Sequence, residues 1–428
     1  MSDLLHIIRQ QQSVYQEHGW RLPIWLAGSE AYTQQQLLAL KPEGNSYWLG
    51  DAAPADFRLL SAKQKQQWLG TECDLLVVDA RSAVDWDLVA ASSGCLKAGG
   101  VWLFVTNEQD LWRQQPNPAA KRVLPYPLNA TAYTGLFKNF WLEQLQDAQW
   151  LQLIEGLPAV IPVLPEVITT AQAELPYRTA EQQQAVAAIY KVVTGHRRRP
   201  LVLTAHRGRG KSSALGLAAA QLAQQGKTDI LLTGPSPVAV QTAFFIAADL
   251  LNQSYQQGQN RLLNGAIRFV PVDALLAEKQ QNTVVLVDEA AAIPTPQLQQ
   301  LTDLYSRLVF ATTEHGYEGT GRGFQLRFQS YLQQHCPGFQ KLHLHQPIRY
   351  QANDPLEQLI FKGFLLEQTD SVITAPLQPK VFSYPIKDLL LQPQKLQQIF
   401  SLLSLAHYQT DVMDLWACLL YTSDAADE

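Results

Sequence analysis

The stretch from Leu201 to Gly216 holds the residues best suited to chemistry in this sequence. It reads L-V-L-T-A-H-R-G-R-G-K-S-S-A-L-G, an apolar strand followed by a glycine-rich turn. Glycines let successive backbone N–H groups converge on phosphate oxygens, a lysine ammonium reaches the outer phosphates, and a serine hydroxyl can ligate Mg²⁺. The stretch therefore predicts a nucleotide phosphate loop, with contacts from Gly208, Arg209, Gly210, Lys211, Ser212 and Ser213.

The start of this loop departs from the usual pattern. The common form begins with glycine, whereas this sequence has Ala205 there. Alanine is acceptable if its φ is negative, because Gly208 and Gly210 serve the tight part of the turn. The alanine- and leucine-rich segment 213–225 is expected to form a helix whose positive N-terminal end faces the same anion.

An acidic segment further along the chain fits the same chemistry. Seventy-seven residues after Lys211, the run T-V-V-L-V-D-E-A-A-A-I-P places Asp288 and Glu289 at the C-terminal end of a β-branched strand. Open parallel sheets bind their ligands at that end. We expect Asp288, with Ser212, to hold Mg²⁺, and Glu289 to orient or deprotonate the attacking water. The alternative is an ordinary acidic turn after a strand.

Two features upstream of the loop each allow a structural and a functional interpretation. In L-P-Y-R-T-A-E-Q-Q, Thr179 and Gln182 have the spacing of a helix capping box. Alternatively, Gln182 or Gln183 reads the adenine edge, because an amide offers a donor beside an acceptor. The basic run 196–199, H-R-R-R, is typical of a solvated turn, with RNA contact as the other interpretation.

Composition bounds the remaining possibilities. The chain has 428 residues, of which 46% are hydrophobic and 17% charged, which is enough for two or three domains. The four cysteines show no C-x-x-C spacing, and His343 and His345 lack a third ligand nearby in sequence, so no zinc site is expected. There is no run of eighteen apolar residues and no signal-peptide pattern, so a cytoplasmic protein without membrane partners is expected.

The last eleven residues, C-L-L-Y-T-S-D-A-A-D-E at 418–428, look like the translation of a transposon adapter used in sequencing libraries. We therefore expect the tail from Cys418 to lack packing of its own. Without its three acidic residues the chain has 33 basic against 35 acidic residues, a net charge of −2 instead of −5. That balance gives no global basic field for nucleic acid.

The order of apolar runs predicts an α/β fold in two main parts. Continuous apolar runs at 22–28, 74–80 and 99–106 indicate a Rossmann-like parallel sheet within residues 1–165. The proline-rich stretch 156–167 marks the boundary. A RecA-like ATPase domain is then expected over 175–355, with further strands in the runs 229–234, 266–272 and 307–313.

The motif that follows makes the assignment specific. A-T-T-E-H-G-Y-E-G-T-G-R-G-F, at 311–324, surrounds Arg322 with Gly316, Gly319, Gly321 and Gly323, and Q-P-I-R-Y then presents Arg349. Such an arginine can make bidentate contacts to a phosphate. Together with D-E-A-A-A-I-P and H-R-G-R-G-K-S, these segments resemble the bacterial tRNA(Met) cytidine acetyltransferase family.

This resemblance implies an N-terminal α/β domain, an RNA-helicase-like ATPase module and a GNAT-type acetyltransferase domain. It implies an enzyme that uses ATP, Mg²⁺ and acetyl-CoA to acetylate the N4 amine of the wobble cytidine in elongator tRNA(Met). Carried over by motif, the nucleotide site would comprise Lys211, Ser212, Asp288, Glu289 and Arg322, with Arg349 as a further candidate.

The acetyltransferase domain is expected only as its first helices, over 356–417. A GNAT fold binds CoA pyrophosphate on a [QR]-x-x-G-x-[GA] loop, and no such pattern occurs between Phe361 and Ala417. Two alternatives are a helicase-type motor ATPase and a non-catalytic, ATP-gated RNA-binding module. The motor needs two RecA-like lobes of about 150 residues each, whereas 94 residues lie from Phe324 to Ala417.

The missing loop leads to a first prediction. The 428-residue chain should show no acetyl-CoA-dependent modification of tRNA(Met), even with ATP. Fusing it to the acetyltransferase domain of a full-length relative should restore the modification. Transfer of a radioactive acetyl group to tRNA measures both, and robust acetylation by the unfused chain would contradict the expectation.

Overall fold

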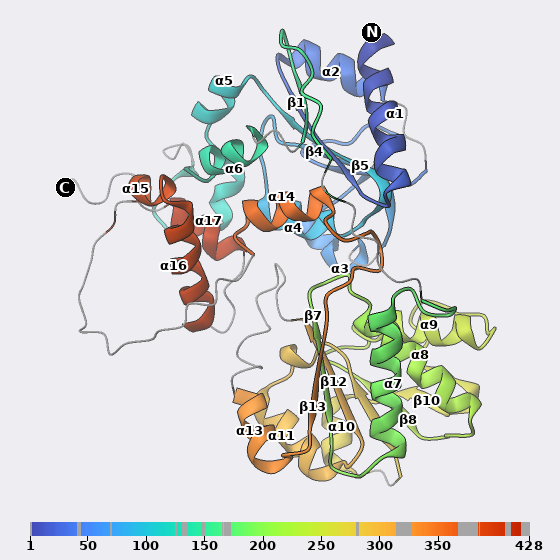
Figure 1. Ribbon diagram of the computed structural model, residues 1–428. Helices are drawn as coiled ribbons and strands as arrows, with labels where there is room; N and C mark the ends of the chain where they lie inside the picture. The colour runs from blue at the N-terminus through green and yellow to red at the C-terminus, as the bar shows by residue number, and fades with distance from the viewer. Residues whose placement is uncertain are drawn as a thin grey trace. The chain divides into compact units, whose positions relative to one another are not determined.

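The computed structural model describes most of the chain, which divides into two compact units (Figure 1). The first unit holds Met1–Ile168 and the C-terminal part from Arg349, and the second holds Thr169–Ile348. The described residues are 2–40, 44–68, 71–124, 126–130, 136–146, 150–164, 166, 173–279, 282–313, 327–366, 384, 386–406 and 412–420.

The first unit is built around a parallel sheet. Its strands are β1 (Leu22–Ala27), β2 (Ser46–Leu49), β3 (Arg58–Leu59), β4 (Cys73–Asp79), β5 (Leu96–Thr106) and β6 (Leu151–Ile154). Within the described residues they pair in the order β3-β2-β4-β5-β1-β6, always in parallel. The apolar runs that predicted strands correspond to β1, β4 and β5, which are almost wholly buried. A sheet covered on both faces requires such runs.

Helices cover both faces of this sheet. They are α1 (Ser2–Glu17), α2 (Glu30–Ala39), α3 (Lys65–Trp68), α4 (Trp86–Ser93), α5 (Gln109–Gln114) and α6 (Leu136–Gln146). Ile8 and Tyr15 of α1 pack on one face. Against the other face lies an aromatic cluster in which Trp86 of α4 contacts Phe104 and Trp141. Each of these large rings buries a large apolar area.

The chain returns to the first unit after the second. This part forms α14 (Pro355–Gly363), α15 (Ile386–Leu390), α16 (Pro393–Ala406) and α17 (Val412–Leu420). The buried Asp354 caps α14 by accepting from the Glu357 N–H, and also receives the Nε, Nη2 and backbone N–H of Arg21. At Gly363, a Cβ would lie 1.8 Å from the Trp141 ring, so only glycine allows α14 to approach α6 this closely.

The described helices of 356–417 group with the first unit, because α14 and α17 pack on α4 and α6. One expectation about this C-terminal part needs correction. The sequence predicts a tail without packing from Cys418, yet α17 runs to Leu420 and the Leu419 side chain is 1% exposed. An amphipathic helix needs an apolar cover, and α4 and α6 provide it. Residues 421–428 lie outside the described part.

The second unit contains the sheet predicted to carry the phosphate loop. Its strands are β7 (Leu201–Ala205), β8 (Ile230–Thr233), β9 (Arg261–Leu262), β10 (Ile267–Phe269), β11 (Val284–Val287), β12 (Leu308–Thr313) and β13 (Gln340–Leu344). Their order among the described residues is β13-β7-β12-β11-β8-β10-β9. Only the β10–β9 pairing is antiparallel. This confirms the α/β class, with β7 and β11 on either side of β12.

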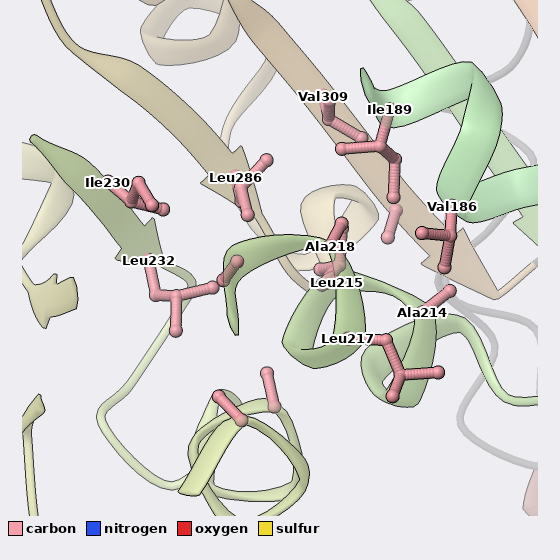
Figure 2. Packing of buried hydrophobic residues seen from close by; sticks show 14 of the residues in the cluster. Val186, Ile189, Ala214, Leu215, Leu217, Ala218, Ile230, Leu232, Leu286 and Val309 are labelled. Atoms are coloured by element: carbon pink, nitrogen blue, oxygen red, sulfur yellow. The ribbon is translucent and has the colours of Figure 1, made fainter. Parts of the chain in front are cut away.

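Alternate side chains of these strands enter two separate cores. The helices are α7 (Ala180–Thr194), α8 (Lys211–Gln224), α9 (Gln241–Leu250), α10 (Val272–Ala277), α11 (Thr295–Leu304) and α13 (Gln329–His335). Figure 2 shows Ile189 of α7 and Leu215 of α8 directed at strand residues such as Leu286. On the other face, α10, α11 and α13 cover Val285 and Phe310. Both faces of the sheet are thus sealed, and its strand ends remain for ligands.

No helix in the described ranges is both long enough and apolar enough to cross a membrane.

One buried charge in the first unit has consequences for stability. The Lys138 side chain on α6 is almost fully buried, and its Nζ donates to the carbonyls of Trp112 (3.3 Å) and Gln115 (3.0 Å) at the end of α5. Within the described residues it forms no ion pair with a carboxylate. Burial therefore lowers the pKa of Lys138 to about 8.

This depressed pKa predicts a specific pH dependence. Between about pH 8 and about pH 10 the unfolded chain keeps the Lys138 proton while the folded protein releases it, so stability rises with pH. Relative to Lys138→Met, the parent protein should gain roughly 3 kcal/mol of unfolding free energy across that window. Urea denaturation of both proteins at several pH values measures the difference. Parallel pH profiles would contradict the burial argument.

Candidate nucleotide site

The phosphate loop joins the end of β7 to the start of α8. Gly208 and Gly210 have φ of +79° and +82°, a left-handed conformation that side chains disfavour. Ala205, at the position where glycine is usual, is the last residue of β7 and does not have positive φ. The substitution is therefore compatible with the turn. Gly210 is also the N-cap of α8, so the helix begins at Lys211 with its positive end at the loop.

Lys211 lies inside this loop, with 6% of its surface exposed. Its Nζ donates to the carbonyl oxygens of His206 (3.2 Å) and Ala205 (3.4 Å). Burial lowers the pKa of Lys211, while the charges of Glu289 and Asp288 oppose that shift. The ammonium is thus held by the loop backbone and faces the acidic pair that follows β11, the next strand but one in the sheet.

Asp288 is fully buried at the end of β11. Its Oδ1 accepts a hydrogen bond from the Glu289 N–H at 3.0 Å, whereas its Oδ2 has no partner among the described residues. Burial and the Glu289 charge raise the pKa of Asp288, and the Ser212 hydroxyl and Lys211 ammonium oppose that rise. Buried polar atoms are nearly always paired, so this unpaired carboxylate oxygen is a candidate ligand for a cation.

Glu289 is held in a conformation unusual for its type. Its φ and ψ are +47° and +46°, in the left-handed region. One of its carboxylate oxygens, Oε2, accepts a hydrogen bond from Thr313 Oγ1 at 3.3 Å, and Thr313 is the last residue of β12. Because β12 lies between β7 and β11, these contacts bring three strand ends to one place. Strained backbone of this kind concentrates at functional sites.

The two glutamines upstream differ in position. Thr179 accepts the Gln182 N–H (3.1 Å) as the N-cap of α7, and Gln182 Oε1 accepts the Arg178 N–H (2.8 Å). This confirms the helix-capping interpretation. The Gln182 amide also lies at the phosphate loop, because a Cβ on Gly210 would be 3.1 Å from its Nε2. Gln183 is exposed to solvent. If a glutamine reads adenine, the geometry favours Gln182.

The segment that follows β13 forms one wall of the loop, which the motifs did not indicate. Arg209 Nε donates to the His345 carbonyl at 2.8 Å, and the Ile348 N–H donates to the Gly208 carbonyl at 3.1 Å. Glu181 Oε2 accepts the backbone N–H groups of His345 (2.6 Å) and Gln346 (2.8 Å). The Arg209 guanidinium thus binds part of the protein itself, which makes it a positioning residue for the loop.

Comparisons with known proteins agree with this geometry. Residues 1–155 match the family model for the N-terminal domain of tRNA(Met) cytidine acetyltransferase TmcA. Residues 202–367 match that for the helicase domain of RNA cytidine acetyltransferase NAT10/TcmA. The TmcA proteins of Vibrio cholerae and Nitrosococcus halophilus are 37% and 39% identical to the chain, over 98% and 86% of its length. The chain belongs to the tRNA(Met) cytidine acetyltransferase family.

Membership of the family is established over part of its length. The chain spans about half the length of the curated relatives it matches, 56% of the Vibrio protein and 51% of the Nitrosococcus protein. Among solved structures, the large terminase of a thermophilic bacteriophage aligns with a TM-score of 0.29 and 14% identity, covering 45% of this chain and 50% of that chain. That similarity is too low to support an argument.

The two arginines suggested by the family motifs have different outcomes. Arg322, with the four glycines around it, lies outside the described residues. Arg349 belongs to the first unit, where its Nη1 donates to the Gly94 carbonyl at 2.8 Å and its Nε lies 3.7 Å from Glu72. Within the second unit, the structure brings together Gly208, Gly210, Lys211, Ser212, Ser213, Asp288, Glu289 and Gln182, but not Arg349. A nucleotide contact from Arg349 stays a prediction.

Asp288 and Glu289 have different hydrogen-bond partners, which leads to a prediction about nucleotide turnover. We expect Glu289→Gln to keep ATP affinity within about threefold and to lower turnover by about 10²- to 10³-fold, because it would remove the carboxylate that we expect to orient the water. Asp288 and Lys211 keep their places. Nucleotide titration and phosphate release measure the two effects, with the exposed Glu278→Gln as a matched control. Equal losses of affinity and turnover would show that Glu289 has another role.

Proposed function

We propose that this chain binds and hydrolyses Mg·ATP at the site formed by the phosphate loop, Asp288 and Glu289. The observation that carries the proposal is the Asp288 carboxylate, which is fully buried with Oδ2 unpaired beside the buried Lys211 ammonium. Burying a charge without a partner is unfavourable. A metal nucleotide would supply the cation that Asp288 lacks and the anion that Lys211 lacks.

The residues present fit a magnesium ion. Hydroxyl and carboxylate oxygens are the donors that Mg²⁺ prefers, and Ser212 and Asp288 lie close enough for the hydroxyl to affect the carboxylate pKa. We propose that these two residues hold the ion. When bound, Mg²⁺ would neutralise charge on the phosphate oxygens.

The remaining residues have roles that follow from their positions. Backbone N–H groups between Gly208 and Ser213 face the phosphates at the start of α8. The Lys211 Nζ exchanges two long contacts with loop carbonyls for contacts with phosphate oxygens. Glu289, oriented by Thr313, holds the attacking water. Gln182, whose amide lies at Gly210, would contact the adenine base.

We further propose that this ATPase serves an RNA-modifying enzyme. The relatives are named tRNA(Met) cytidine acetyltransferases. The proposed whole reaction transfers an acetyl group from acetyl-CoA to the N4 amine of the wobble cytidine of elongator tRNA(Met), coupled to ATP hydrolysis. For the present chain we limit the catalytic proposal to ATP, since the CoA-loop pattern does not occur between Phe361 and Ala417.

Substitution of the loop lysine tests the proposal directly. Lys211→Ala should lower ATP turnover by at least about 10²-fold, because it removes the cation that faces the phosphates, while the thermal unfolding profile stays that of a folded protein. Lys279→Ala, which changes an exposed lysine of the same unit, should leave turnover unchanged.

Three outcomes separate the candidate functions. Turnover that depends on Lys211 supports the hydrolase. Nucleotide binding without turnover in the parent protein would favour the ATP-gated RNA-binding module. Equal turnover in the parent and in Lys211→Ala would contradict the site itself.

A further inference from the structure

Four arginines gather in the second unit where the parallel strands of its sheet begin, at the end opposite the phosphate loop. They are Arg197, Arg198, Arg199 and Arg307, here called the arginine cluster. The first three occupy the turn that leads into β7, and Arg307 directly precedes β12, the neighbouring strand. The cluster therefore lies where parallel strands begin, whereas Lys211 and Asp288 lie where strands end. The side chains of Arg197, Arg198 and Arg199 are exposed.

Hydrogen bonds hold this turn in place. The Arg198 N–H donates to the Ser306 carbonyl at 2.9 Å. Arg307 Nη1 donates to the carbonyls of Val192 (2.5 Å) and Gly195 (2.6 Å), which close the C-terminal end of α7. The backbone of the turn that carries the arginines is thus held in place, so less backbone entropy is lost when the arginines bind a ligand.

The cluster also reaches the beginning of a third strand, β13. The Arg199 side chain lies along the turn before β13, because a Cβ on Gly338 would be 3.1 Å from its Cγ and Nε. The Arg198 charge acts on the buried Cys336 thiol in the same turn. Since β13, β7 and β12 are neighbours, the positive charges spread over two strand spacings, about 10 Å. That width matches several phosphates of one nucleic-acid backbone.

The part of the chain that the structure describes does not neutralise the cluster. Among the described residues no ion pair involves Arg197, Arg198 or Arg199. Burial and then the Arg197 charge lower the pKa of Arg307, so the guanidinium groups repel one another. Asp303, whose charge acts on the Cys336 thiol, accepts a hydrogen bond from the Tyr331 hydroxyl at 2.8 Å. In a chain of net charge −5, such a patch is a local exception.

We propose that the arginine cluster binds the phosphate backbone of RNA, at a site separate from the nucleotide site. This inference rests on the proposed function, in which the partner is a tRNA. Planar guanidinium groups make bidentate contacts to phosphate oxygens. Contacts of this kind position a nucleic acid without reading its sequence. Bound RNA would also relieve the mutual repulsion of the arginines.

The test measures affinity for RNA as a function of salt. The full 428-residue chain is titrated with an elongator tRNA(Met) transcript, and compared with a triple variant carrying Arg197→Ala, Arg198→Ala and Arg199→Ala. We expect at least tenfold weaker binding at about 0.1 M salt, and a salt slope smaller by about 2 to 3 because three phosphate contacts are lost. ATP turnover without RNA should stay unchanged.

Two matched variants separate a local effect of the cluster from a change in net charge. Replacing the exposed Arg9, Lys63 and Lys121 by alanine removes the same formal charge from the first unit, and should change affinity by less than about threefold. Replacing the three cluster arginines by lysine keeps their charge and should retain most of the affinity and of the salt slope. A fold defect would appear as altered thermal unfolding and lost ATP turnover in the triple alanine variant.

Each remaining outcome counts against the proposal. If the triple variant and the charge control lose RNA affinity equally, the effect comes from net charge and the proposal is overturned. The triple alanine variant is also titrated with poly-glutamate. If it keeps its RNA affinity but loses poly-glutamate binding, the cluster binds an acidic protein instead of RNA. A parent chain that fails to bind the transcript contradicts both this inference and the tRNA part of the proposed function, whereas strong binding unaffected by the triple substitution contradicts the inference alone.

Discussion

The candidate site depends on the proximity of two buried charges, the Lys211 ammonium and the Asp288 carboxylate. Burial shifts the pKa of each toward its neutral form, and each opposes the shift of the other. Removing either residue would let burial shift the pKa of the other further toward its neutral form. Their proximity requires that β7 and β11 flank β12 in parallel, so that all three strands end at one edge. The sealed cores on both faces of the sheet maintain this arrangement.

Much of this could be predicted from the sequence, because the signals are local. The run 283–287 corresponds to β11 (Val284–Val287), and the tight turn requires glycine at 208 and 210, both of which have positive φ. The order of the strands in the sheet could not be predicted in this way. The sequence shows that strands precede Lys211 and Asp288, but not that β12, which follows both in the chain, lies between them. That order results from long-range packing.

Long-range contacts explain what the sequence could not reveal. Arg21 and Asp354 are 333 residues apart, yet they form a buried ion pair in which Arg21 Nε and Nη2 both donate to Asp354 Oδ1. Asp354 also caps α14, and nothing local in the sequence identifies Arg21 as its partner. The helices after Asp354 group with the first unit, far in the chain from the strands that they join. Glu181 binds the segment after β13 in the same unpredictable way.

The two ends of the parallel strands in the second unit's sheet differ in whether their positive charges have acidic partners. At the C-terminal edge, the loop N–H groups and Lys211 face an acidic pair, which suits a metal nucleotide. At the N-terminal edge, the arginine cluster has no acidic partner in the described ranges. The five residues of β7 separate these edges by about 16 Å, more than the Debye length of about 8 Å at physiological salt. Two polyanions bound at the two edges would therefore repel each other little.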